Sequence, residues 1–133
     1  MNKVTHFEIP ADDKARSKEF YSSVFGWQVV DTPVQMGGGT ETYTSASTVE
    51  TDPTTYLPTE PGAINGAIIE RTSQLTAPVI TITVDSIDEH LEKVTAAGGK
   101  IVEGKQEVEN MGYYAYVLDP ADNVIGLWED VVT

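Results

Sequence analysis

The sequence predicts an α+β fold that is built twice along one chain. The run THFEIPADD, continuing into FYSSVFGWQVV, is echoed about seventy residues later by VITITVDSID, continuing into LEKVTAAGGKIV. Each copy reads as an alternating strand, an acidic loop, an amphipathic helix, a glycine stop and a second strand. The echo places His6 and Val79 at equivalent strand positions. A length of 133 residues suits one domain, so we expect a single domain, residues 1–133, made of two modules at about 1–72 and 78–133.

The first module contains local signals for one helix and three further strands. Asp12 or Asp13 can cap a helix that runs to about Phe25, and Gly26 stops it. The glycines at 37–39 indicate a turn. The segments ETYTSAST and AINGAIIER alternate as strands do, and a loop, TDPTTYLPTEPG, separates them.

The second module repeats this order. A helix is predicted from about Ser86 to Ala97, with apolar residues on one stripe and charged residues on the other, and two glycines follow it. The segments YYAYVLDP and NVIGLWEDV are predicted strands. Asp119 to Asn123 forms the tight turn between them, where Pro120 presets one backbone dihedral angle.

Composition and charge exclude several classes of function. A net charge of −13, from 21 acids and 8 bases, repels phosphate backbones, so we expect no nucleic-acid partner. No cysteine is present, which excludes disulfides and thiolate chemistry. No apolar run reaches the length of a membrane span or a signal peptide, so a cytoplasmic protein without a membrane partner is expected. The dispersed acids fit either a protein adapted to high salt or an ordinary acidic cytosolic protein.

Five segments together carry a resemblance to a known family: HFEIPADD, FYSSVFGW, GAINGAI, AAGGKIV and DPADNVIGLWE. In this order and spacing the chain resembles the vicinal oxygen chelate superfamily, which includes glyoxalase I, bleomycin-resistance proteins and extradiol dioxygenases. The resemblance covers nearly the whole chain. It implies two βαβββ modules whose strands form a cupped mixed sheet around a central cavity, and it implies a homodimer.

The resemblance also implies where a metal would bind. In enzymes of this family, two polar side chains from each module hold a divalent ion that chelates vicinal oxygens of the substrate. His6 matches one ligand position, but Val79 and Gly126 stand at two others, and Gly66 is the expected residue at the fourth. One imidazole does not hold a divalent ion tightly, because such sites need three or four ligands. No cofactor is therefore expected, and the alternative is a metal held by a rebuilt ligand set.

Strand alternation predicts a ligand pocket instead. Two tyrosines and a tryptophan share one strand face with threonine hydroxyls, which suits an organic ligand better than a metal. Filling of the cup or covering of a subunit interface would explain the same aromatics. His90 is expected to be a solvated helix residue, and Glu129 to face away from the pocket. The predicted pocket residues are His6, Glu8, Asn65, Thr81, Thr83, Tyr114, Tyr116 and Trp128.

Two classes of function remain open from the sequence. The first is a protein that binds a small organic molecule without the family's full metal site. The second is a lyase or isomerase related to lactoylglutathione lyase, with His6 and Glu8 as catalytic residues and His6 as the base. A third class, an oligomerisation module without a ligand, is also open, because fold alone does not decide function.

Overall fold

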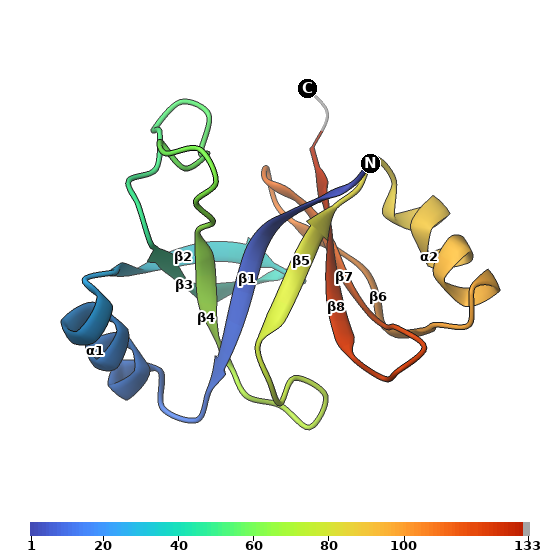
Figure 1. The fold of residues 1–133 in the computed structure, drawn as a ribbon, viewed down its shortest axis with the longest axis horizontal. Helices are drawn as coiled ribbons and strands as arrows, with labels where there is room; N and C mark the ends of the chain where they lie inside the picture. The colour runs from blue at the N-terminus through green and yellow to red at the C-terminus, as the bar shows by residue number, and fades with distance from the viewer. Residues whose placement is uncertain (132–133) are drawn as a thin grey trace. The chain divides into compact units, whose positions relative to one another are not determined.

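The computed structural model describes residues 1–131, and within them it shows eight strands and two helices in the order strand, helix, three strands, twice over (Figure 1). This order confirms the predicted α+β class and the two βαβββ modules. The elements are β1 (Lys3–Ala11), α1 (Lys14–Phe25), β2 (Gln28–Met36), β3 (Gly39–Ser47), β4 (Gly66–Glu70), β5 (Val79–Thr83), α2 (Ile87–Ala96), β6 (Lys100–Val108), β7 (Gly112–Leu118) and β8 (Val124–Asp130).

The contacts divide the chain into two compact units. The amino-terminal unit comprises His6–Pro33 and Thr42–Pro78. The carboxy-terminal unit comprises Met1–Thr5, Val34–Glu41 and, within the described residues, 79–131. The start of the chain and the hairpin between β2 and β3 belong to the carboxy-terminal unit.

In the amino-terminal unit, β4 lies between β1 and β3. It pairs in parallel with β1, where Ala67 is opposite Glu8, and antiparallel with β3, where Ala67 is opposite Ser45. Helix α1 begins where the Asp13 side chain accepts a hydrogen bond from the Arg16 amide at 3.2 Å. Gly26 ends it with a left-handed φ of 73°. The core contains Ala11, Val29, Ala46 and Ile68, with Phe7, Tyr21 and Trp27 packed against them.

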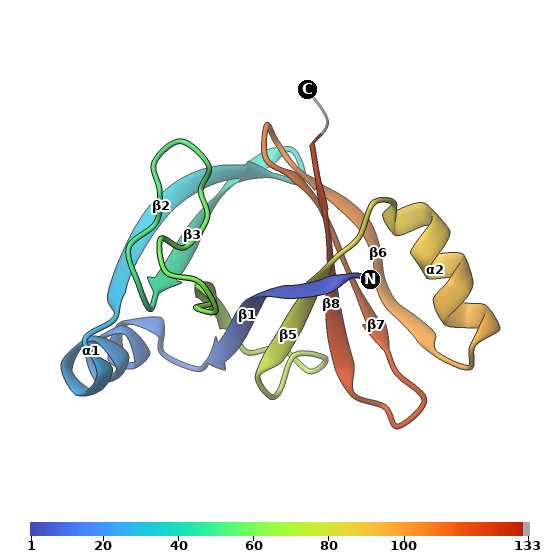
Figure 2. The ribbon, with the colours of Figure 1, turned by 45° about the horizontal axis from the view of Figure 1, so that its top comes forward.

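In the carboxy-terminal unit the strand order is β6-β7-β8-β5 (Figure 2). Helix α2 covers one face of this sheet. Its cap is Ser86, whose hydroxyl accepts from the Glu89 amide at 3.2 Å. The core beneath the helix contains Val84, Ile87, Ala115, Val117 and Leu127.

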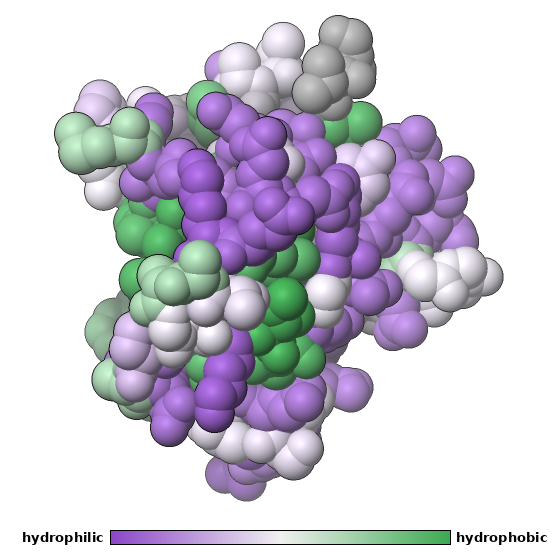
Figure 3. Space-filling view, turned by 90° about the vertical axis from the view of Figure 1, so that its right-hand side faces the viewer, coloured by the Kyte–Doolittle hydropathy of each residue, from purple (hydrophilic) through white to green (hydrophobic). Residues whose placement is uncertain are grey.

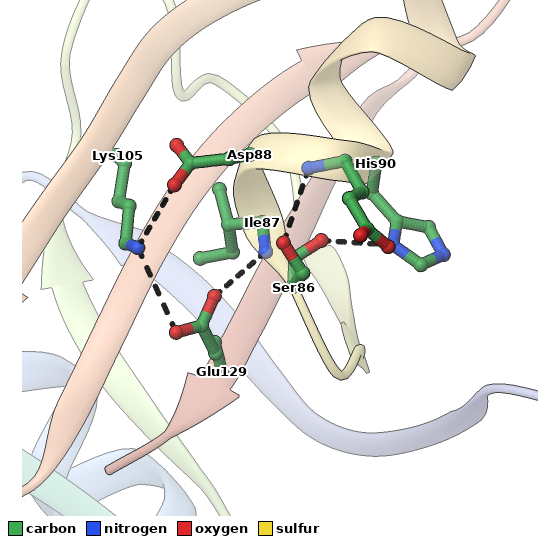
Figure 4. A network of polar contacts seen from close by, with 7 residues as sticks. Ser86, Ile87, Asp88, His90, Lys105 and Glu129 are labelled. Atoms are coloured by element: carbon green, nitrogen blue, oxygen red, sulfur yellow. Dashed lines mark hydrogen bonds and ion pairs between the residues drawn. The ribbon is translucent and has the colours of Figure 1, made fainter. Parts of the chain in front are cut away.

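A polar network fixes the first turn of α2 to this sheet (Figure 4). The Ile87 amide donates to a Glu129 carboxylate oxygen at 2.7 Å, and the Lys105 ammonium lies 3.3 Å from Asp88 and 3.6 Å from Glu129. Glu129 therefore faces α2, on the side of the sheet away from the predicted pocket residues of β7 and β8, as strand alternation predicted. Its carboxylate sits at the positive end of the helix dipole, where a negative charge is stabilising.

His90 is not the solvated residue that its charged surroundings suggested. It is half-buried, and its Nδ1 lies 2.9 Å from the Ser86 carbonyl oxygen. With Nδ1 donating to that carbonyl, Nε2 accepts from the Asn2 amide group at 3.0 Å. The imidazole thus ties the start of the chain to α2 within the carboxy-terminal unit.

An apolar patch lies among hydrophilic atoms on the α2 side of the molecule (Figure 3). Beside α2 there is a hollow of about 510 Å³, whose lining is mainly aliphatic and includes Ile82, Val94, Val117 and Ile125. Neither described helix combines the length and hydropathy of a membrane span.

Candidate functional site

The sheet face of the carboxy-terminal unit opposite the α2 core carries five of the predicted site residues. Register places Thr81 opposite Gly126 and Gly126 opposite Tyr116, which forms one cross-strand row. The next row is Thr83, Trp128 and Tyr114. Because alternate strand residues point to opposite faces, and Ala115, Val117 and Leu127 belong to the α2 core, these two rows share the other face. We call Thr81, Thr83, Tyr114, Tyr116 and Trp128 the aromatic face.

The rings of the aromatic face are held by specific contacts. Tyr114 and Tyr116 meet edge to face with ring centroids 5.7 Å apart. The Tyr114 hydroxyl donates to Glu103 at 3.3 Å, and the Trp128 indole N–H donates to Asp130 at 2.7 Å. Glu103 was not predicted, because two irregularities in the pairing of β6 with β7 break the alternation on that strand.

Two glycines make room for neighbouring side chains rather than for a ligand. A Cβ atom placed on Gly126 would lie 2.8 Å from the Thr81 hydroxyl oxygen, so the threonine already occupies that space. A Cβ on Gly112 would lie 2.6 Å from the Trp128 ring. Neither glycine therefore leaves open space for a bound molecule at its own position.

The amino-terminal unit brings His6 and Glu8 together with Tyr43. The Tyr43 hydroxyl lies 3.4 Å from His6 Nε2. Burial, and then the negative charge of Glu8, raise the pKa of Tyr43, so its hydroxyl stays protonated at neutral pH. We call His6, Glu8 and Tyr43 the His6 cluster. Tyr43 was missed because it lies on a different strand, and only the pairing of β3 with β4 brings it near β1.

The protonation state of His6 follows from its environment. Burial lowers the pKa of His6 to about 4, and a backbone hydrogen bond with Asn65 opposes that shift. The imidazole is therefore neutral at pH 7, and an unprotonated Nε2 accepts from the Tyr43 hydroxyl. A neutral imidazole can accept a proton or a hydrogen bond from a substrate, but a pKa near 4 makes it a weak base.

The Asn65 side chain is fully used within the fold. Its carbonyl oxygen accepts from the Thr48 amide at 2.7 Å, the Thr48 hydroxyl at 3.1 Å and the Val49 amide at 3.2 Å. Its amide nitrogen donates to the Val49 carbonyl at 3.2 Å and the Thr51 hydroxyl at 3.0 Å. These bonds fix the loop after β3, so the side chain is not available to a ligand.

Strand register revises one family position. Glu8 and Thr81 are equivalent in the repeat, and their partners across the parallel pairs are Ala67 and Gly126. Ala67, rather than the expected Gly66, is therefore the counterpart of Gly126. A Cβ on Gly66 would meet the Phe7 ring at 2.6 Å, so that glycine serves packing.

The residues present do not fit the metal site that the family implies. Within residues 1–131 no group of three or more histidine, aspartate or glutamate side chains could hold a metal ion. Val79 is a buried apolar residue, and Ala67 and Gly126 carry no donor atom. Among the four family ligand positions of the described chain, only that of His6 carries a side chain that could bind a metal ion.

Two curated proteins are similar to this chain in sequence. The chain is 29% identical over 124 residues to the protein named "Putative glyoxylase CFP32" of Mycobacterium tuberculosis, and equally to that of Mycobacterium bovis; each match covers 92% of this chain and 43% of the relative. The chain thus spans less than half the length of these curated relatives.

Solved structures show the same fold at low identity. A methylmalonyl-CoA epimerase from Mycobacterium tuberculosis matches with a TM-score of 0.61 and 13% identity over 96% of this chain and 87% of that one. A glyoxalase I variant from Zea mays matches with a TM-score of 0.63 and 19% identity over all of this chain and 44% of that one. The model of one family matches residues 3–127. The chain belongs to the glyoxalase/bleomycin resistance protein/dioxygenase superfamily.

Proposed function

We propose that this chain binds a small organic molecule on its aromatic face and does so without the family's metal ion. The observation that carries the proposal is the placement of Tyr114, Tyr116 and Trp128 in two adjacent cross-strand rows beside two threonine hydroxyls. Aromatic faces with a few fixed polar groups suit the recognition of planar or partly polar organic ligands. The superfamily includes bleomycin-resistance proteins, which supports a binding function for a member with this donor set.

The proposed ligand-bound protein is a homodimer. This part of the proposal rests on family membership, and the composition adds a constraint. A net charge of −13 on each copy opposes association, so a dimer interface must offset that repulsion locally.

Binding is tested by calorimetric titration of bleomycin, methylmalonyl-CoA and a set of small aromatic acids, each compound first screened by thermal shift. Tyr114→Leu should weaken binding of any hit about two- to tenfold, because an aromatic contact contributes roughly 0.5–1.5 kcal/mol beyond its buried area. Tyr56→Leu is the matched control, since that tyrosine is 79% exposed on a loop of the other unit. Equal affinities in the two variants would exclude the aromatic face as the binding surface.

The proposal that binding needs no metal ion is tested by elemental analysis. The protein is purified without chelator and measured again after incubation with nickel, zinc, manganese or iron. We expect far less than one metal ion per chain. A stoichiometric metal that is lost in His6→Ala would overturn this part and indicate a ligand set built around the imidazole.

The His6 cluster favours one second candidate, a lyase or isomerase that uses His6 as base. A neutral imidazole beside a tyrosine hydroxyl and a carboxylate is an arrangement that can move a proton, although the lowered pKa of His6 weakens it as a base. The assays are disappearance of the hemithioacetal of methylglyoxal and glutathione, and epimerisation of methylmalonyl-CoA. Turnover that His6→Ala abolishes and Tyr43→Phe reduces would establish this candidate over the binding protein.

A further inference from the structure

Helix α1 exposes an apolar surface that its own unit does not cover. The helix has no fully buried residue, and the exposed fractions of Phe20, Val24 and Phe25 are 52%, 56% and 59%. Large apolar side chains that gather on a surface, rather than occurring singly, mark interaction sites.

The exposed rings of Phe20 and Phe25 contact the rings of Tyr21 and Trp27, which pack against the core of the unit. Tyr21 stacks on Trp27 with ring centroids 4.9 Å apart, and Trp27 contacts the Phe7 ring at 5.5 Å. Phe20 meets Tyr21 edge to face at 5.1 Å, and Phe25 lies 5.9 Å from Trp27. Rings that are ordered before binding lose little conformational entropy when a partner covers them.

The same helix has the opposite charge to the rest of the chain. Lys14, Arg16 and Lys18 are three of only eight bases in the protein, and Glu19 is the single acid of the helix. Helix α1 therefore carries +2, and because the whole chain carries −13, the remainder carries −15.

Arg16 belongs to the same surface as the exposed apolar residues. It is exposed and lies four residues before Phe20, which lies four before Val24, so the three form one stripe. Lys14 and Lys18 are turned toward their own unit, where Lys14 donates to the Thr42 carbonyl at 3.5 Å and Lys18 lies 3.9 Å from Asp31. We call Arg16, Phe20, Val24 and Phe25 the α1 patch.

We propose that the α1 patch is the surface on which a second copy of this chain docks, with Arg16 against the partner's acidic surface and the apolar side chains buried. This inference rests on the proposed homodimer and names its surface. Arg16 is the one charge among the four residues of the α1 patch, and its sign is opposite to the net charge of the chain. It is therefore complementary to the acidic surface of another copy, and this local complementarity supplies the attraction that net charge opposes.

The test is sedimentation velocity of the full chain over a concentration series at physiological salt. Arg16→Glu should weaken self-association by about tenfold or more, because it replaces an attraction with a repulsion. The substitution preserves the helix, since glutamate at the third helical position supports the Asp13 cap. Phe20→Ser should weaken association similarly.

Matched controls make the same changes elsewhere. Lys100→Glu alters the charge equally, and Ile101→Ser removes a side chain that is 48% exposed; both lie on β6 of the other unit and should leave association unchanged. Circular dichroism and thermal unfolding confirm that each variant is folded.

The outcomes separate this inference from the proposed homodimer. A dimer that Arg16→Glu and Phe20→Ser weaken, and that the controls do not, supports the α1 patch. If neither substitution changes the strength of self-association, the α1 patch is not the interface, but the proposed homodimer remains supported. A chain that stays monomeric at every concentration overturns both. A monomer that binds vesicles of anionic phospholipid, and loses that binding in Arg16→Glu, assigns the patch to lipid instead.

Discussion

At the scale of single residues, His6 is a buried histidine whose protonation the fold opposes. Its pKa is lowered to about 4 from an ordinary value of 6.5. Below pH 6.5 the unfolded chain takes up a proton at His6 that the folded chain takes up only near pH 4. Stability should therefore fall as the pH falls through this window, by at most about 3 kcal/mol.

The prediction is checked by urea unfolding at pH 7 and pH 4.5. His6→Gln should remove this part of the pH dependence, while His90→Gln, at the only other histidine, should retain it. Both variants contain the same carboxylates, so the difference between them isolates His6. Parallel losses of stability in the two variants would contradict the assigned pKa.

Also at this scale, Gly126 is required by Thr81. Gly126→Ala places a Cβ atom 2.8 Å from the threonine hydroxyl oxygen and should cost roughly 1–3 kcal/mol of unfolding free energy. When Thr81 is replaced by alanine, the nearest atom left at position 81 is its Cβ, 3.4 Å from the new Cβ at position 126. The loss of unfolding free energy caused by Gly126→Ala should then fall by more than half. A double-mutant cycle measures this coupling, and additive effects would show that the two residues are independent.

At the scale of elements, α2 is fixed to its sheet by Glu129, whose side chain is 15% exposed. Glu129→Gln weakens the bond to the Ile87 amide and removes the charge opposite Lys105, so we expect a loss of about 1–2 kcal/mol. Hydrogen exchange should accelerate in the first turn of α2. Glu107→Gln, on an exposed position of β6, is the control, and equal exchange in the two variants would reject the anchoring role.

At the scale of the whole molecule, the net charge of −13 sets the response to salt. Salt screens the repulsion between the acidic side chains, so the midpoint of thermal unfolding should rise between about 10 mM and about 1 M sodium chloride. Over this range the Debye length falls from roughly 30 Å to roughly 3 Å. Sucrose at matched osmolality controls for exclusion from the surface, which stabilises without screening. A midpoint that salt leaves unchanged would identify an ordinary acidic protein.

Features that depend on local geometry could be predicted from the amino-acid sequence. Backbone periodicity places Tyr114 and Tyr116 opposite Ala115 and Val117, and this was predictable because alternation is a property of any strand. Helix ends were equally predictable, since Asp13 and Gly26 satisfy the unpaired groups of α1 with atoms close in sequence.

Contacts between residues that are distant in sequence could not be predicted, because they depend on strand pairing and packing. Register across β1 and β4 places Ala67 opposite Glu8, a choice of one residue that no local pattern specifies. Tyr43 reaches His6, and Thr81 fills the space at Gly126, through neighbouring strands that are far apart in sequence. The chemistry of both candidate surfaces thus depends on long-range packing and burial, which also lower the pKa of His6.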